Sequence, residues 1–185
     1  MQLEDAITSR RTVREYTAAE VPRQLLEALL HTTVQSPSAR NRQPWFFCVL
    51  TGRHRIDEYA QRAKQHLLDG DASLEVSDLR TQLLNPSFDI FYHAPAVVIV
   101  CARNGAPQDV EDCCVAAQTF MLAARGHDLG TCWVGLARPW LNLPTTKHEL
   151  GLPAECQIVA PIVVGHPRQW PPAHGRLEPV VRWIE

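Results

Sequence analysis

The first feature with clear chemical potential is a basic cluster near the N-terminus, Ser9-Arg10-Arg11-Thr12-Val13-Arg14. It places three guanidinium groups and a threonine hydroxyl within six residues. Arginine presents fixed donors that match phosphate oxygens in pairs, and a dianionic phosphomonoester needs about this many donors to leave water. The cluster therefore indicates a phosphate site. Most short basic clusters are solvated surface turns, so the cluster alone leaves both interpretations open.

A second feature is the stretch of residues 36–45, Ser-Pro-Ser-Ala-Arg-Asn-Arg-Gln-Pro-Trp, between a predicted helix and a predicted strand. It is rich in small hydroxyls, amides and prolines. A loop of this kind can offer backbone N–H groups and amide donors to a planar polar heterocycle, and loops often carry function. The alternative is an ordinary helix-to-strand connection.

Two further features lie in the second half of the chain. Residues 126–135 read Gly-His-Asp-Leu-Gly-Thr-Cys-Trp-Val-Gly, which matches neither the Gly-x-Gly-x-x-Gly dinucleotide fingerprint nor a P-loop. This stretch is typical of a helix end, a turn and a strand. His174-Gly175-Arg176 adds a basic site near the C-terminus, which has no meaning by itself.

Several catalytic schemes are excluded because their motifs are missing. The sequence has no Gly-x-Ser-x-Gly elbow, no His-Glu-x-x-His and no Cys/His set with zinc spacing. The six cysteines fall mostly in apolar runs and are predicted to be core residues, with another role left open only for Cys132. An enzyme without an evident nucleophile or acid–base set points to a cofactor that supplies the chemistry.

The composition is that of a globular protein. The 185 residues are 45% hydrophobic and 21% charged, and no linker divides them, so we expect a single domain over residues 1–185. The formal net charge of -2 gives no basic field for nucleic acid or anionic lipid. The start Met1-Gln2-Leu3-Glu4-Asp5 is unlike a signal peptide, and residues 94–101 are too short to span a bilayer. We expect a cytoplasmic protein with no nucleic-acid or membrane partner.

The elements that must position these features are predicted from periodicity and punctuation. Helices are expected over residues 3–8, over 53–68, and from Pro22 at a helix N1 position to about residues 35–37. A long helix with unusually small apolar residues is expected over 109–125, central in the fold or at a subunit interface, and a less defined one around 74–84. Strands are expected over 45–50, 95–101, 131–136 and 157–165, the first two of them buried. An extended arm of twenty residues with four prolines ends the chain. Helices mixed with short strands favour an α+β fold over an α/β fold.

Taken together and in this order, these residues resemble the nitroreductase family of flavoproteins. The similarity runs from about residue 3 to residue 183. It is strongest in the arginine cluster, in residues 36–45, in Ala94-Pro95 and in residues 128–135. Gly165-His166-Pro167 and Arg176 also fall where the family places such residues.

The resemblance implies an α+β, nitroreductase-like sheet-and-helix fold and an obligate homodimer, with two FMN sites at the dimer interface. It implies that the phosphate and the flavin edge are contacted by Arg10, Arg11, Thr12 and Arg14, and that Arg176 closes on the phosphate. The flavin would be lined by Pro37, Ser38, Ala39 and Asn41, the first three from the partner subunit. Beside the ring would run Trp133, Val134, Gly135 and Leu136, with a backbone N–H near N5.

Three departures from the family pattern qualify this assignment. Ala39 stands where members often have serine, so one hydroxyl contact is missing. His174 stands where a second basic residue commonly precedes the closing arginine, and it is a weaker base. Residues 69–89 leave little room for the lid that larger members fold over the flavin.

The resemblance implies an FMN-dependent oxidoreductase that passes electrons from NAD(P)H to a nitroaromatic, a quinone or a similar small acceptor. Arg14 near the N1–C2=O edge would stabilise the negative charge of reduced flavin, and no catalytic side chain is required. Some relatives instead act as flavin-dependent dehydrogenases or oxidases on peptide-derived substrates, and this alternative stays open. A non-catalytic flavin-binding protein is the third interpretation.

Overall fold

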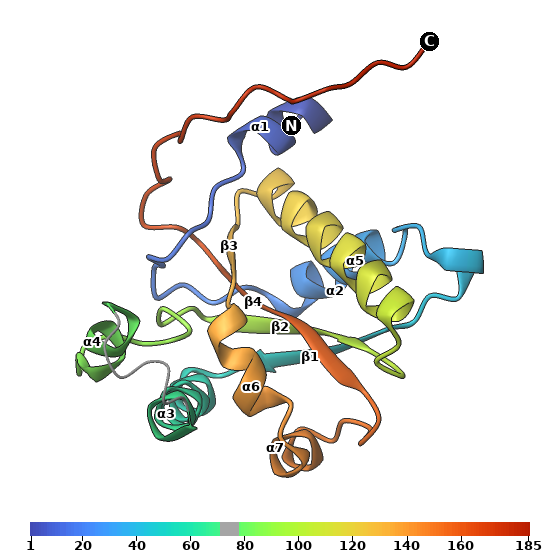
Figure 1. The fold of residues 1–185 in the computed structure, drawn as a ribbon. Helices are drawn as coiled ribbons and strands as arrows, with labels where there is room; N and C mark the ends of the chain where they lie inside the picture. The colour runs from blue at the N-terminus through green and yellow to red at the C-terminus, as the bar shows by residue number, and fades with distance from the viewer. Residues whose placement is uncertain (71–77) are drawn as a thin grey trace.

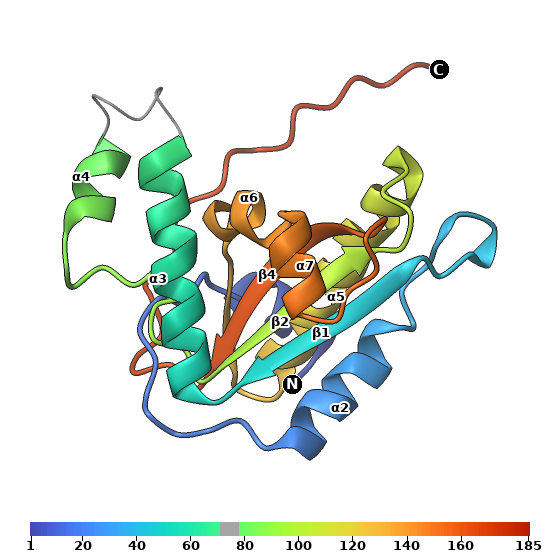
Figure 2. The ribbon, with the colours of Figure 1, turned by 90° about the horizontal axis from the view of Figure 1, so that it is seen from below.

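A computed structural model of the chain describes residues 1–70 and 78–185. At its centre is a four-stranded sheet in the order β1-β2-β4-β3, in which every neighbouring pair is antiparallel. Helices cover both faces of this sheet (Figures 1 and 2). The strands are β1 (Trp45–Thr51), β2 (Ala96–Ala102), β3 (Gly130–Trp133) and β4 (Gln157–Gly165). The α+β fold class predicted from the sequence is confirmed.

Strand β2 shows how the sheet separates two apolar layers. Its side chains alternate: Val97, Ile99 and Cys101 pack with α3 (Arg53–Gly70) and α6 (Arg138–Leu141). The residues between them pack on the other face with α2 (Arg23–Thr33) and α5 (Pro107–Gly126). Because both faces are covered, all seven residues of β2 are buried, and its sequence is a continuous apolar run rather than an alternating one.

Helix α5 lies along one face of the sheet and carries the small residues noted in the sequence (Figure 1). Cys113, Ala116, Ala117 and Ala124 are fully buried. Short side chains let a helix backbone approach its neighbours closely, so this helix packs centrally against strands and α2. The prediction of a helix over residues 109–125 is confirmed. Pro107, which needs no intrahelical N–H partner, sits in its first turn.

The remaining elements frame this core. The helices predicted over residues 3–8 and 53–68 are confirmed as α1 (Leu3–Ser9) and α3. The helix predicted around 74–84 is observed as α4 (Asp78–Leu84), and residues 74–77 fall outside the described residues. A short helix, α7 (Pro144–Glu149), follows α6. Among the helices of the described residues, none is long and apolar enough to cross a membrane.

The strand predicted over residues 131–136 was too long. Strand β3 ends at Trp133, and Gly135–Ala137 forms a 3-10 turn, η3, that leads into α6. Val134 leaves extended geometry with φ −97° and ψ 78°, although its N–H still donates to the Pro161 carbonyl at 2.8 Å. Gly135 and Leu136 therefore lie beyond the sheet.

Three smaller predictions were also wrong in detail. Helix α2 ends at Thr33, short of residues 35–37, because the Ser36 hydroxyl donates to the Thr33 carbonyl at 2.7 Å and closes a turn there. Pro22 precedes the first helical residue instead of occupying N1. Strand β1 was predicted to be buried, but it is an edge strand, and Phe46 and Val49 remain 37% and 36% exposed.

Residues 166–185 form the predicted extended arm, which contains no helix and no named strand. Its first part returns to the N-terminal segment, where Pro167 makes an isolated bridge with Tyr16. Its last part leaves the body of the molecule (Figures 1 and 2) and exposes large apolar side chains. These side chains belong to Leu177, Val180, Val181, Trp183 and Ile184.

Candidate functional site

The arginine cluster is positioned by main-chain pairing with β3. Thr12 bridges Thr131 in parallel, and the Val13 N–H donates to the Thr131 carbonyl at 3.0 Å. This close approach depends on Gly130, because a Cβ there would lie 2.6 Å from the Val13 side chain. Val13 points into the core with 1% exposure. Since successive residues of an extended segment point to opposite sides, Thr12 and Arg14 are left on the outer side.

The C-terminal arm is fixed against the residues that follow the cluster. The Thr17 N–H donates to the His166 carbonyl at 2.9 Å, and the Arg168 N–H donates to the Glu15 carbonyl at 3.0 Å. The Arg168 guanidinium also donates to the Tyr16 carbonyl at 3.0 Å. These bonds hold the start of the C-terminal arm against the N-terminal segment that follows the arginine cluster.

One residue of α5 holds both ends at once. The Arg125 guanidinium lies 4.1 Å from the centroid of the Trp170 ring on the arm, a cation–π contact. Its Nε also donates to the Ser9 hydroxyl at 3.0 Å, at the end of α1. Arg125 therefore links the arm and the segment before the cluster to the central helix.

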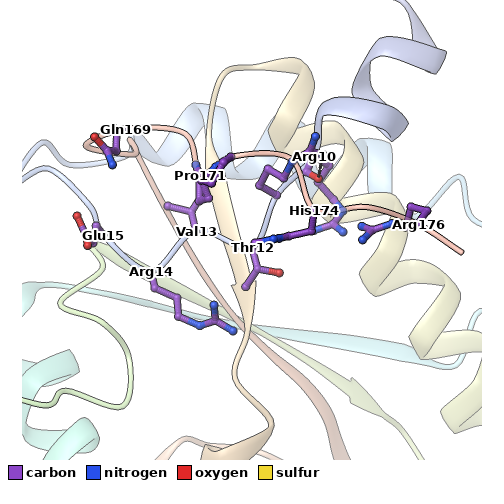
Figure 3. A pocket seen from close by; sticks show the side chains of 11 residues that line it. Arg10, Thr12, Val13, Arg14, Glu15, Gln169, Pro171, His174 and Arg176 are labelled. Carbon is purple, nitrogen blue, oxygen red and sulfur yellow. Dashed lines mark hydrogen bonds between the residues drawn. The ribbon is translucent and has the colours of Figure 1, made fainter.

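Between these segments lies a cavity of about 470 Å³ (Figure 3), within the usual size range of small-molecule sites. In Figure 3 the side chains of Arg10, His174 and Arg176 lie on one side of it, with Arg14 and Glu15 on the other. Its lining residues are Arg10, Arg11, Thr12, Val13, Arg14, Glu15, Gln169, Pro171, Pro172, His174 and Arg176.

The charge around this cavity is strongly unbalanced. Four arginines line it, and Glu15 is the only carboxylate among the lining residues. Arg11 donates to the Thr8 and Arg10 carbonyls at 2.7 and 2.9 Å, so part of its guanidinium is already used. Within the described part of the chain, the guanidiniums of Arg10 and Arg176 have no hydrogen-bond or ion-pair partner. Such a site is suited to an anion with several oxygens.

Arg14 extends toward a different set of neighbours. Its guanidinium lies 5.8 Å from the centroid of the Tyr92 ring. Burial acts to lower the pKa of Arg14, but hydrogen bonding and charge interaction with Tyr92 and Cys132 raise it above its ordinary value. Burial raises the pKa of the Cys132 thiol and of the Tyr92 phenol, and Arg14 offsets part of each shift. At neutral pH this corner holds a fixed cation between two neutral groups.

Of the predicted site residues, the structure brings together Arg10, Arg11, Thr12, Arg14 and Arg176 around one cavity. The stretch Trp133, Val134, Gly135 and Leu136 continues from the strand that pairs with Thr12, but it does not line that cavity. Val134 is buried, Trp133 and Leu136 are half-buried, and Gly135 is exposed. Their predicted place beside a flavin ring stays a prediction.

The structure does not bring Pro37, Ser38, Ala39 and Asn41 to this cavity. They lie on a loop that projects from the opposite end of the molecule, and both views show this separation (Figures 1 and 2). The resemblance expects the first three of them to reach the flavin from the partner subunit. A position remote from the chain's own arginines is consistent with that expectation.

The sequence interpretation missed several residues that lie at the site. Glu15, Gln169, Pro171 and Pro172 line the cavity, and the last three could have been suspected from the proline-rich arm alone. Tyr92 contacts Arg14 from a segment in which nothing in the sequence marked it. The contact depends on tertiary packing, which local patterns do not report.

Three other side chains have ligand atoms within 4.8 Å of one another, those of Asp57, Asp89 and His93. They have structural roles instead. One Asp89 oxygen accepts the backbone N–H groups of Phe91 and His93 at 2.8 and 3.1 Å and so caps a turn. Asp57 pairs with Arg53 at 3.8 Å. No reaction chemistry is assigned to this group.

The chain is similar in sequence and in fold to known flavoproteins and reductases. The profile of the Nitroreductase family matches residues 7–166. A 4-nitrobenzoate reductase of Nocardioides sp. is 26% identical, with 88% of this chain and 79% of that protein covered. An iodotyrosine deiodinase of Thermotoga neapolitana is 25% identical over 98% of this chain and 97% of its own. The crystal structure of a nitroreductase with bound FMN from Desulfitobacterium hafniense superposes with a TM-score of 0.86 at 21% identity, over the full length of both chains.

Proposed function

The chain belongs to the nitroreductase family, and we propose that it is an FMN-dependent oxidoreductase that passes electrons from NAD(P)H to a small acceptor such as a nitroaromatic or a quinone. The observation that carries this proposal is the arginine-lined cavity between the two ends of the chain. Nitroreductases of the same fold have been crystallised with FMN bound.

The cavity residues fit the phosphate end of FMN. A phosphomonoester carries close to two negative charges and three acceptor oxygens at neutral pH. Arg10 and Arg176 offer donors that nothing else in the described chain uses, and Thr12 adds a hydroxyl at the same wall. These residues, with the remaining donors of Arg11, would hold the phosphate.

Arg14 and the stretch after β3 would hold the ring. Arg14 carries a positive charge at neutral pH as any arginine does, and its neighbours raise its pKa further. A fixed cation favours a flavin that becomes anionic on reduction. The stretch Trp133, Val134, Gly135 and Leu136 would offer backbone groups along the ring edge. When bound, FMN supplies hydride transfer, so the protein contributes binding, orientation and electrostatics without a side-chain nucleophile.

The proposal includes a homodimer. The loop with Pro37, Ser38, Ala39 and Asn41 lies far from the cavity of its own chain (Figures 1 and 2). The end of the arm exposes Leu177, Val180 and Trp183 by 98%, 102% and 84%, and a chain in water gains by covering such side chains. A second copy would cover the arm and supply the missing loop. A cytoplasmic location remains part of the same prediction.

The test is a visible spectrum of the purified protein, followed by anaerobic addition of NADH and then NADPH. We expect a yellow protein whose released cofactor is FMN, and bleaching of the flavin band by at least one nicotinamide. Reoxidation by a nitroaromatic or a quinone should restore the band. A colourless protein that takes up no FMN would contradict the proposal. A yellow protein inert to both nicotinamides would contradict the reductase direction and favour a dehydrogenase.

A further inference from the structure

The projecting loop of residues 36–45 has an unusually strained backbone. Arg40, Asn41 and Gln43 have φ values of 53°, 53° and 47°, in the left-handed region that residues with side chains rarely occupy. All three side chains are exposed, so apolar packing does not impose this conformation. Strained conformations persist only where surrounding contacts determine them. Two main-chain bonds inside the loop, from the Asn41 N–H to the Ser38 carbonyl at 2.9 Å and from the Arg42 N–H to the Ala39 carbonyl at 3.1 Å, hold part of it, and contacts with the rest of the chain hold its position.

The contacts that hold it come from the first turns of α5. The Ala39 N–H donates to both carboxylate oxygens of Asp112, at 3.1 and 3.2 Å. Arg42 lies 3.0 Å from the carboxylate of Asp109. Ala39 and Arg42 flank the first two strained residues, so the loop is fixed on each side of Arg40 and Asn41. Within the loop, the Gln43 N–H donates to the Ser38 hydroxyl at 2.9 Å.

The two carboxylates are buried, and within α5 the described residues give them one side-chain contact, the bond that Gln108 Nε2 donates to Asp112 at 3.3 Å. Asp109 is fully buried and Asp112 is 6% exposed. A buried carboxylate is costly unless it is paired, and Arg42 is the only ion-pair partner of Asp109 among the described residues. An exposed carboxylate in the first turn would stabilise the helix dipole equally well, without the cost of burial. The burial therefore serves the loop.

We propose that Asp109 and Asp112 are positioning residues for the flavin site of the partner subunit, because they hold residues 37–41 in the conformation that the neighbouring FMN requires. This inference rests on the proposed function. The two aspartates touch no flavin themselves. They act through Ala39 and Arg42, which lie far from the arginine-lined cavity of their own chain, so each FMN site would depend on α5 of the other subunit.

The first experiment compares Asp112→Ala and Asp112→Asn with Glu111→Gln, which changes a neighbouring exposed carboxylate. Asp112→Ala removes the acceptor of the Ala39 N–H, and we expect FMN affinity to fall about tenfold or more. Asp112→Asn keeps one acceptor oxygen and should recover part of the affinity, while Glu111→Gln should match wild type. Thermal unfolding of the FMN-free proteins is measured in parallel. If Asp112 had a purely structural role, its variants would unfold at lower temperature, but their FMN affinities would not fall in the order Glu111→Gln, Asp112→Asn, Asp112→Ala.

The second experiment asks whether the effect crosses the dimer. Chains with Asp112→Ala and chains with Arg14→Ala carry different affinity tags and are co-expressed, and the mixed dimer is purified on both tags. If the loop serves the partner, one site of the mixed dimer has two damaged components and the other has none. We expect about half of the wild-type FMN content and activity. If the loop serves its own chain, both sites are damaged and neither is recovered.

The outcomes separate this inference from the proposed function. A wild-type protein that binds no FMN would remove the proposed function and this inference with it. A wild-type protein that binds FMN, with Asp112→Ala and Asp109→Asn binding it equally well, would overturn this inference alone. A mixed dimer with no recovered site, or a chain that remains monomeric with FMN bound, would also overturn it. Should Asp112→Ala not fold, Asp112→Asn and Asp109→Asn carry the same comparison.

Discussion

The arginine-lined cavity and the loop of residues 36–45 are two parts of one proposed site, and they are built in different ways. The cavity is complete within one chain, because main-chain bonds bring the N-terminal cluster and the C-terminal arm together. The loop lies at the opposite end of the molecule (Figure 1). Two buried aspartates of α5 contact it. In the proposed site, phosphate binding would be a property of the protomer, while enclosure of the flavin would need the dimer.

The largest effect should come from the cavity. Arg14→Ala removes a cation that we place against the flavin edge, and we expect FMN affinity to fall by about 10- to 100-fold, with slower reduction by NAD(P)H. Fluorescence titration with FMN and stopped-flow reduction measure the two effects. Arg55→Ala, on the exposed face of α3, is the matched control and should change neither. Wild-type affinity and rate in Arg14→Ala would remove Arg14 from the site.

Gly130 tests whether the cavity depends on the close approach of the cluster to β3. In Gly130→Ala the new Cβ would meet three atoms of the buried Val13 side chain at 2.6, 2.7 and 2.9 Å. We expect a loss of about 1–3 kcal/mol in the free energy of unfolding, together with weaker FMN binding. Gly126→Ala is the control, because a Cβ there meets no atom within 4 Å apart from its chain neighbours and the backbone of its own helix. Equal denaturation midpoints for the two variants would contradict this account of the strand pairing.

Arg176 separates phosphate recognition from ring recognition. Arg176→Ala should reduce FMN affinity about tenfold, because one charge-assisted contact is lost, and leave the affinity for riboflavin unchanged. The paired titrations give both constants on one protein sample. A parallel loss for both ligands would mean that Arg176 acts on the ring or on the fold.

The smallest effect should come from the residue that fastens the arm. Arg125→Ala removes the cation–π contact with Trp170, the bond to Ser9 and an ion pair with the exposed Asp128 at 2.9 Å. Cation–π contacts contribute about 0.5–2 kcal/mol, and Arg125 does not line the cavity, so FMN affinity should fall only a few-fold. Arg125→Lys keeps the charge and should recover part of this loss. Limited proteolysis should cut the arm of Arg125→Ala faster than that of the wild-type protein, and unchanged cleavage would show that the arm is held elsewhere.

The arginine-lined cavity and the loop of residues 36–45 also differ in how much of each could be predicted from the sequence. The cluster was recognisable because three arginines in six residues are unusual, and the valine-rich β2 and the small-residue α5 were predicted from composition and periodicity alone. Residues 36–45 were marked by their composition. Asp109 and Asp112, which hold this loop, were not predicted. Aspartates in the first turns of a helix are common, and a local sequence pattern does not reveal that they are buried.

A local turn and tertiary packing account for the other misses. Strand β3 was predicted three residues too long, since the Ala137 N–H donates to the Val134 carbonyl at 3.2 Å and closes a 3-10 turn after Trp133. Tyr92 reaches Arg14 from a segment nearly eighty positions away, beyond any local pattern. The exposure of β1 depends on its place at the sheet edge, which a continuous apolar run does not indicate.

We propose that the arginine-lined cavity binds the phosphate of FMN. Equilibrium titration of the FMN-free protein with FMN and with riboflavin, which differ in that phosphate, tests it most directly. We predict that FMN binds at least about tenfold more tightly, and that the preference shrinks as salt screens the arginines. Equal affinities for the two flavins, or no binding of either, would contradict the account.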